Sequence, residues 1–386
     1  MVQKKSKKTV FRVTNALILL FFITVLSFTA CSAPPSETDS AQPYFVVVGN
    51  ATDMGAYSKD GIVWEPKKMD TMMYQPRVCY GKDKFVTIGD TGTNQKHSID
   101  GIEWDNGTFN TDGQWWNSIC YGAGKFLVIS HFGRIVYSDD GINDWVTNWD
   151  AMNTVSNISP WNSVCYGNRK FVAVGNGAGA YSIDGSGEWN EITALSSMSW
   201  NSVCYGNGKF VVIGNYNNEY GIAYHSIDGI TWYKAEVMPD GMKNETAWRS
   251  VCYGNNRFVA VAGGHGMYSD KTVYSRDGGK TWSLGNGLPE ANWLSVCYGN
   301  GTFVAVAGDP ADSEDGNKAA YSRDGETWVP VTTFSGPGGV GNWQSIVHGG
   351  DARKVPQLFA SLREKAGTLL AYITGWFSDK NLSVNM

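Results

Sequence analysis

Hydrophobic residues occur in short runs that recur at a regular interval along the chain, and Gly, Asn or Asp separates the runs. A segment of the form Trp-x-Ser-Val/Ile-Cys-Tyr-Gly is followed, after a short turn, by Phe-Val-x-Val/Ile, for example from Trp161 to Val174 and from Trp248 to Val261. Short runs rich in β-branched and aromatic residues, bounded by turn-forming residues, are typical of β-strands. The pattern therefore predicts a β-hairpin that is repeated along the chain.

A second motif has the same period: Ser, any residue, Asp, Gly, and a Trp a few residues later. Its seven copies, 40 to 49 residues apart, begin at Ser58, Ser98, Ser138, Ser182, Ser226, Ser275 and Ser322. Each copy ends at a Trp, namely Trp64, Trp104, Trp145, Trp189, Trp232, Trp282 and Trp328. Repeats of this length, with four predicted strands and no helix, indicate the blades of a β-propeller.

The order of strands within a repeat predicts how the ring closes. The first strand is the Trp-x-Ser-Val-Cys-Tyr segment, the second is Phe-Val-x-Val, the third ends in Tyr-Ser or His-Ser, and the fourth starts at the motif Trp. The second strand occurs seven times, whereas the first occurs six times plus a degenerate copy from Trp343 to His348. The chain thus enters at a second strand, at Tyr44, and ends with a first strand, and pairing of these two strands leaves no exposed sheet edge.

We therefore predict an all-β fold over residues 44–349: a seven-bladed β-propeller of four-stranded antiparallel blades, closed by pairing of the N- and C-terminal strands. An eighth blade would have to come from residues 350–386, which lack the motif. We interpret this tail as a C-terminal appendage.

The Ser-x-Asp-Gly…Trp motif resembles the Asp-box, or BNR repeat, of sialidase-type propellers over the whole of residues 44–349. The resemblance implies a turn between the third and fourth strands, on the face opposite the ligand site. Ser and Asp side chains can bond to nearby backbone groups, Gly permits a positive φ angle, and Trp can pack between blades. We interpret the equivalent aspartates as structural, not catalytic or metal-binding: Asp60, Asp100, Asp140, Asp184, Asp228, Asp277 and Asp324.

The first thirty residues resemble a bacterial lipoprotein signal peptide. Basic residues up to Arg12 precede an apolar stretch over 16–28, and Phe28-Thr29-Ala30-Cys31 follows it, with Phe28 in place of the more usual Leu. The resemblance implies that Cys31 is lipidated and that the protein is anchored to a membrane of the cell envelope, outside the cytoplasm. Residues 31–43 are expected to be a flexible tether. The alternative is an uncleaved membrane anchor.

Composition narrows the choice of partners. The net charge of −5 argues against nucleic acid, because binding to phosphates requires a basic surface. Six cysteines occupy one equivalent place in successive repeats and are expected to be small buried residues, not disulfides: Cys79, Cys120, Cys165, Cys204, Cys252 and Cys297. We expect no cofactor, no metal and a monomer. The acidic loop with Asp309, Asp312, Glu314 and Asp315 is interpreted as solvated, and His131 and His265 as isolated surface residues.

Two sets of residues mark the start of the innermost strand as a candidate ligand-binding site. The first position holds Trp116, Trp161, Trp200, Trp248, Trp293 and Trp343, with Gln75 in the seventh repeat. The next position varies among Asn117, Asn162, Asn201, Arg249, Leu294 and Gln344. The aromatic faces could ring the mouth of the channel and stack on sugars or prolines, or they could pack between blades. The ligand-binding candidates are these tryptophans with Asn117, Asn162, Asn201, Arg249 and Gln344.

Three functions follow from these features. We favour a non-catalytic binding or scaffold lipoprotein that binds a glycan or a protein partner. The alternatives are a sialidase-like glycoside hydrolase and an assembly factor for an envelope complex, like the Asp-box propeller that assists photosystem II assembly. Sialidases typically have six blades and an early Phe/Tyr-Arg-Ile-Pro motif, which the segment from Tyr74 to Arg77 does not match. Hydrolysis also needs two facing carboxylates, and nothing in the sequence pairs Asp90, Glu219, Asp270 and Asp309.

Overall fold

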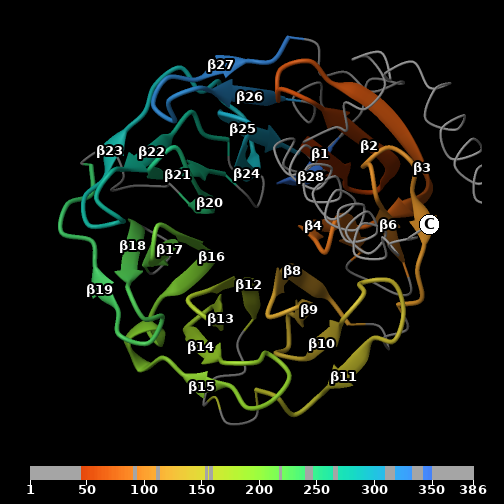
Figure 1. Cartoon of the computed structure of the whole chain (residues 1–386). Coiled ribbons are helices and arrows are strands. Elements are labelled where there is room, and N and C mark those ends of the chain that lie inside the picture. The colour runs from red at the N-terminus through yellow and green to blue at the C-terminus, as the bar shows by residue number, and fades with distance from the viewer. Residues whose placement is uncertain are drawn as a thin grey trace, which may run out of the picture. The chain divides into compact units, whose positions relative to one another are not determined.

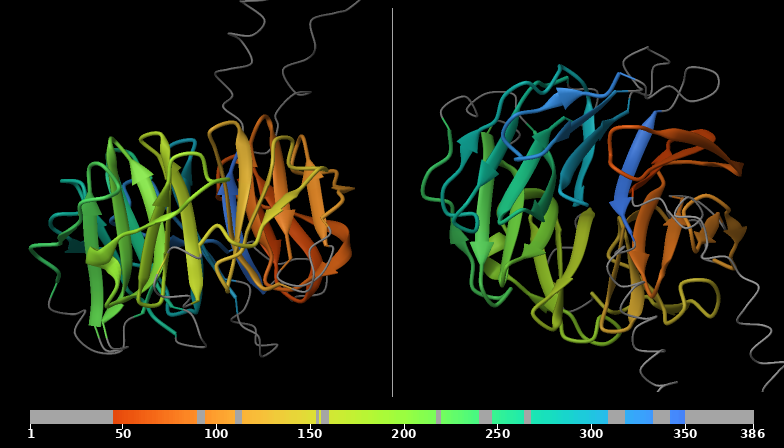
Figure 2. Two further views of the ribbon diagram at one scale, coloured as in Figure 1. Left: turned by 90° about the horizontal axis from the view of Figure 1, so that it is seen from below. Right: turned by 45° about the horizontal axis from the view of Figure 1, so that its top comes forward.

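Seven four-stranded antiparallel sheets are arranged in a ring, so the protein is an all-β, seven-bladed β-propeller, as the repeats predict (Figure 1). The computed structural model describes residues 45–89, 94–109, 114–152, 155, 160–216, 220–239, 247–263, 268–308, 318–332 and 342–349. The predicted signal peptide, Cys31, the tether, Tyr44 and the predicted appendage lie outside the described residues. Figure 2 shows the blades from the side, with their strands standing next to one another around the ring.

The blades share one order of strands, with the first strand innermost. The first four sheets are formed by β28 (Trp343–His348), β1 (Phe45–Gly49), β2 (Thr52–Ser58) and β3 (Glu65–Met73); β4 (Arg77–Gly81), β5 (Lys84–Ile88), β6 (Gln95–Ser98) and β7 (Asp105–Asn106); β8 (Trp116–Gly122), β9 (Lys125–Ser130), β10 (Ile135–Ser138) and β11 (Val146–Asn148); and β12 (Trp161–Gly167), β13 (Lys170–Gly175), β14 (Ala178–Ser182) and β15 (Asn190–Glu191). The remaining three are formed by β16 (Ser199–Gly206), β17 (Lys209–Tyr216), β18 (Tyr220–Ser226) and β19 (Tyr233–Lys234); β20 (Trp248–Gly254), β21 (Arg257–Ala262), β22 (Thr272–Ser275) and β23 (Ser283–Leu284); and β24 (Trp293–Gly299), β25 (Thr302–Ala307), β26 (Ala319–Ser322) and β27 (Val329–Pro330), with a short 3-10 helix, η1 (Thr193–Leu195), after β15.

The ring closes where the two ends of the pattern meet. Strand β1 pairs antiparallel with β28, so that Phe45 lies opposite His348 and Val47 opposite Ile346. One blade is therefore built from both ends of the repeat region, and this confirms the predicted closure. The pairing gives β28 the same kind of partner that every other innermost strand has within its own sheet.

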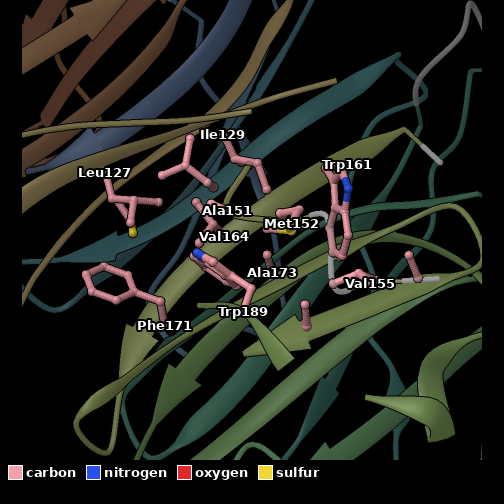
Figure 3. Close-up of a cluster of buried hydrophobic side chains, with 14 residues drawn as sticks. Leu127, Ile129, Ala151, Met152, Val155, Trp161, Val164, Phe171, Ala173 and Trp189 are labelled. Atoms are coloured by element: carbon pink, nitrogen blue, oxygen red, sulfur yellow. The ribbon is translucent and has the colours of Figure 1, made fainter. Parts of the chain in front are cut away.

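The hydrophobic core lies between adjacent blades. Figure 3 shows one cluster, in which Leu127 and Ile129 of β9 lie beside Val164 and Trp189 of the next blade. Leu127 and Ile129 have alternating positions in β9, so one face of the blade is apolar and packs against its neighbour. Burial of this surface at about 25 cal/mol per Å² is the main force that holds the blades together.

The Ser-x-Asp-Gly motif forms a hydrogen-bonded turn after the third strand of each blade. In one copy the Ser226 hydroxyl donates to Asp228 Oδ1 at 2.9 Å, while the backbone N–H groups of Ile230 and Thr231 donate to the same oxygen at 2.8 and 2.7 Å. The backbone N–H of Gly229, at φ 75°, donates to the Ser226 hydroxyl at 2.8 Å. Corresponding bonds from Ser and backbone N–H groups reach the aspartate in all seven copies.

The motif Trp belongs to this turn and not to the fourth strand. For example, the indole N–H of Trp282 donates to the carbonyl of Gly279 at 3.1 Å, and β23 begins one residue later. The predicted start of the fourth strand at the Trp is therefore wrong by one residue in each blade. The indoles of Trp64 and Trp104 bond to their own turns in the same way, and in every blade the residue after the Trp begins the sheet pairing.

A glycine at the end of each innermost strand allows the next blade to approach closely. A Cβ atom added to Gly206 would lie 2.0 Å from Cγ of Tyr253, whose ring packs against Phe258 with centroids 4.9 Å apart. The same contact joins Gly81, Gly122, Gly167 and Gly254 to the tyrosines of the following blades, and it joins Gly299 to His348 and Gly349 to Tyr80. Close packing between adjacent blades thus requires a glycine after the tyrosine of Cys-Tyr-Gly around the whole ring.

The cysteines of the innermost strands lie where adjacent blades meet. Cys79, Cys120, Cys165, Cys204, Cys252 and Cys297 are free thiols and are buried or half-buried, as predicted. Burial raises the pKa of Cys204 to about 12, so these thiols are neutral at physiological pH.

Within the described ranges, no helix has the length and apolar character needed to cross a membrane.

Candidate functional site

A cavity of about 570 Å³ lies at the starting ends of the innermost strands, where the seven blades converge. Its size falls within the range of small-molecule sites, about 300–1,000 Å³. The described residues that line it are Gln75, Arg77, Trp115, Asn117, Ser118, His131, Pro160, Asn162, Ser163, Asn176, Asn201, Ser202, Arg249, Ser250, Leu294, Ser295, Gln344 and Ser345. Amides, hydroxyls and two guanidinium groups dominate this wall.

The predicted tryptophan ring lies behind this wall and not on it. Trp116, Trp161, Trp200, Trp248 and Trp293 are 0% exposed, and Trp343 is 1% exposed. Their side chains belong to the clusters between blades, so the packing interpretation describes their place correctly, and the expectation that their faces ring the channel mouth is corrected. The physical reason is the bulge after each Trp, which shifts the register of the innermost strand by one residue and turns the next two side chains to the channel.

Three of the predicted asparagines tie neighbouring blades together at the cavity wall. The side-chain amide of Asn117 donates to the carbonyl of Trp161 at 2.7 Å. Asn162 and Asn201 repeat this bond to the tryptophan carbonyls of the next blades, each at 2.8 Å. These Nδ2 donors are occupied within the protein, whereas an amide oxygen can still accept a bond from a ligand.

A ring of serines lies one residue further along. The hydroxyl oxygen of Ser163 accepts a bond from the backbone N–H of Val203 in the next blade at 3.2 Å. Equivalent bonds are accepted by Ser118, Ser202, Ser250, Ser295 and Ser345. Arg77 stands at this position in the seventh blade, and its Nε donates to the carbonyl of Asn117 at 2.7 Å. Hydrogen bonds thus connect each blade to the next along the inner wall.

The wall departs from this regular pattern in one sector. Arg249, Leu294 and Gln344 occupy the place of the asparagines in β20, β24 and β28, which are consecutive around the ring. No hydrogen bond from these three side chains is found within the described part of the chain. The donors of Arg249 and Gln344 are therefore available to a ligand, whereas the asparagines of β8, β12 and β16 use an Nδ2 donor within the protein.

Arg249 gives the sector its positive charge. The residue as a whole is half-buried, and burial of its guanidinium lowers the pKa of the group from its ordinary value. No Asp or Glu lines the cavity within the described ranges, and no ion pair of Arg249 is found there. A partly desolvated cation is stabilised by an anionic or strongly accepting group, so the sector suits a polar or negatively charged ligand.

Trp115 and His131 also line the cavity, although the sequence did not mark them as site residues. His131 was expected to be an isolated surface residue, but it lies in the wall with its Nδ1 3.4 Å from Nδ2 of Asn117. Trp115 precedes the buried Trp116 by one residue and is 52% exposed. A comparison of the repeats could have identified Arg77, which replaces a serine found in the other six, but nothing in the pattern identifies His131.

The other candidate groups lie elsewhere. Asp270 is exposed and forms an ion pair with Lys271 at 2.6 Å, away from the cavity wall. Asp90, Glu219, His265 and the predicted acidic loop with Asp309, Asp312, Glu314 and Asp315 lie outside the described residues. Among the described residues, no group of His, Cys, Asp or Glu side chains is arranged to hold a metal ion.

Solved structures with similar folds have varied functions. YCF48 bound to a D1 peptide is 13% identical, with a TM-score of 0.50 over 78% of this chain and 88% of that one. Virginiamycin B lyase from Staphylococcus aureus is 10% identical, with a TM-score of 0.52 over 66% of this chain and 83% of that one. The GH74 enzyme of Niastella koreensis is 13% identical, with a TM-score of 0.50 over 75% of this chain and 54% of that one. At these identities the likeness shows the fold alone. No protein-family model and no curated protein matches the chain.

Proposed function

We propose that this chain is a lipid-anchored protein of the cell envelope that binds a glycan or a protein partner at the central cavity without catalysing a reaction. The observation that carries the proposal is the irregular sector of the cavity wall. Arg249 and Gln344 can bond to a ligand there, while the rest of the wall is held rigid by bonds between blades. A rigid wall reduces the entropy that is lost when a ligand binds.

The location and the finer family likeness are part of the same proposal. The basic and apolar segments before Cys31 support cleavage and lipidation at that residue, with residues 31–43 as a tether to a monomeric propeller. The hydrogen bonds of the seven Ser-x-Asp-Gly turns support an Asp-box (BNR) propeller of the sialidase-like kind. In that arrangement the aspartates hold turns, and ligands bind at the opposite face.

Peptide binding is known for one protein of similar fold, since YCF48 has been captured with a D1 peptide. An assembly factor for an envelope complex would be a special case of the proposed binding function. A glycoside hydrolase would need two carboxylates, about 5–10 Å apart, on either side of the scissile bond. The described part of the cavity wall offers guanidinium, amide and hydroxyl groups instead, which favours binding.

The proposal can be tested with the full chain on a glycan array and a peptide library, together with a panel of chromogenic glycosides. Arg249→Ala should weaken binding of the captured ligand by about tenfold or more, because a charge-assisted hydrogen bond is worth about 1.5–3 kcal/mol. Lys234→Ala, which removes a positive charge from the exposed outermost strand β19, is the control and should leave affinity unchanged.

Two results would contradict the proposal. Turnover of any glycoside by the wild-type chain would replace binding by hydrolysis. Equal affinity of the Arg249→Ala and wild-type proteins would move the binding site away from the central cavity.

A further inference from the structure

An exposed aromatic cluster lies at the rim of the central cavity. Trp115 and Phe132 are 52% and 54% exposed, and their ring centroids are 6.0 Å apart. His131 joins them, with its ring 5.4 Å from that of Trp115 and 5.0 Å from that of Phe132. Apolar surface left in water forgoes about 25 cal/mol per Å², so two large rings at half exposure are costly unless something covers them.

The cluster is continuous with the cavity. Trp115 and His131 both contribute to its wall, and His131 lies beside the Asn117 amide at 3.4 Å. A ligand seated among the amide and hydroxyl groups would therefore meet the indole of Trp115 at its outer end.

The cluster is held firmly by backbone bonds. The N–H of His131 donates to the carbonyl of Trp115 at 2.7 Å, and the N–H of Trp161 in the next blade donates to the carbonyl of His131 at 3.0 Å. A tight turn at Gly133, with φ 77°, closes the loop by a bond to the carbonyl of Ser130 at 3.1 Å. The aromatic surface is thus fixed before a ligand arrives.

Packing of the repeats does not require an aromatic residue at this place. Trp115 lies one residue before Trp116, the first residue of its innermost strand. The residues at the equivalent position of the other six blades are Tyr74, Pro160, Ser199, Ala247, Asn292 and Asn342. Tyr74, in the adjacent blade, is 50% exposed, whereas Ala247, Asn292 and Asn342 are buried. Among the described residues at this position, the exposed aromatic ones, Trp115 and Tyr74, therefore lie in adjacent blades.

We propose that Trp115 and Phe132, whose ring planes are 33° apart, form a stacking platform for a sugar ring of a glycan whose remaining hydroxyls enter the central cavity, and that His131, edge-on to both rings, supports them. This inference rests on the proposed binding function and commits its ligand to a carbohydrate. A pyranose ring has one face of C–H groups, which pack on an indole, and a rim of hydroxyls, which both donate and accept hydrogen bonds. The wall offers both kinds of partner, because the asparagine amide oxygens can accept a bond and the serine hydroxyls can donate one.

A protein partner fits the cluster less well. A stable protein interface buries about 800 Å² on each partner around an apolar centre. Here the aromatic cluster borders a polar cavity that carries Arg77 and Arg249, an arrangement scaled to a small polar ligand with one apolar face.

The test measures affinity of the full chain for an array of neutral and acidic oligosaccharides and for a peptide library, by calorimetry of the ligands captured. Trp115→Ala should weaken saccharide binding by about tenfold, and Trp115→Phe should restore most of it, because a stacking contact is kept. Phe132→Ala provides a second variant with a smaller loss in the same direction. Tyr233→Ala is the control, because Tyr233 is 57% exposed on the outermost strand β19 and should not matter.

The outcomes separate this inference from the proposed function. Saccharide binding that Arg249→Ala weakens and Trp115→Ala does not would overturn the platform and leave the binding function standing. Capture of peptides alone, sensitive to Arg249→Ala, would overturn the carbohydrate ligand only. Binding of neither class would overturn both.

Discussion

Replacing Gly206 with alanine should destabilise the propeller by about 2 kcal/mol, because the next blade occupies the space that the new methyl group needs. The added Cβ would lie 2.0 Å from Cγ and 2.3 Å from Cδ1 of Tyr253. An ordinary carbon–carbon contact is about 3.5–4.0 Å, so the tyrosine ring or the strand must move by about 1.5 Å. The ring cannot turn aside freely, since Phe258 packs against it.

The magnitude follows from two opposing effects. Overpacking a well-packed interface costs about 1–3 kcal/mol, and a contact this short between two blades belongs at the upper end. Gly206 does not have a positive φ angle, so alanine fits its backbone and stabilises by about 0.4–1 kcal/mol through the entropy of the unfolded chain. The difference leaves a net loss of about 2 kcal/mol.

Urea denaturation would measure this loss in a double-mutant cycle with Tyr253→Gly, because the Cβ of Tyr253, 2.4 Å from the added methyl group, would remain in an alanine variant. In that background Gly206→Ala should cost less than about 1 kcal/mol, because both the ring and the Cβ that obstruct it are gone. Gly89→Ala is the control: its nearest contact would be 3.6 Å away, and its stability should change by less than about 0.5 kcal/mol. A loss that is the same with and without the Tyr253 ring would refute the explanation.

Two further predictions concern pH. Burial alone would raise the pKa of Asp228, but the hydrogen bonds to its carboxylate together outweigh burial and lower the pKa to about 2. This turn therefore contributes stability that is fully present above about pH 4 and is lost as the pH falls towards 2. Urea midpoints measured between pH 7 and 3 should fall less steeply in Asp228→Asn than in the wild type. Burial lowers the pKa of Lys96, which is 4% exposed, although Asp70 and Asp105 oppose the shift. The unfolded chain therefore binds the lysine proton more readily than the folded protein, and the free energy of unfolding should rise as the pH approaches 10.5. A rise of equal size in Lys96→Met would contradict this reasoning.

The sequence specified the fold more completely than the site because the fold repeats and the site does not. Seven copies of one pattern determine blade number, strand order and closure, and a single copy from Trp343 to His348 is enough to show how the ring closes. The innermost tryptophans illustrate the limit. A Trp at the same position of six repeats is compatible with a side chain that lines the channel or with one that packs between blades. The bulge after the Trp places the side chain between blades, and the sequence pattern does not predict that bulge.

The residues available to a ligand are those that break the repeat, and they could be found only in part. Variation at a regular position of the repeat predicts Arg249 and Gln344 as site residues, and both lie in the cavity wall. Asn117, selected on the same ground, donates its amide to a tryptophan carbonyl of the next blade, a bond that depends on the distance between two strands. His131 reaches the wall through the four-residue loop between β9 and β10, and the spacing of residues along the chain carries no sign of it.

The pairing of β1 with β28 also determines when the fold can be completed during synthesis on the ribosome. Phe45 leaves the ribosome long before His348, and at about 5–20 residues per second the interval is about 15–60 s. Throughout that time one edge of β1 has no partner, and an unpaired edge is a template for wrong association. The pairing that completes this blade is thus the last one to form, and β1 keeps an unpaired edge until the final strand arrives.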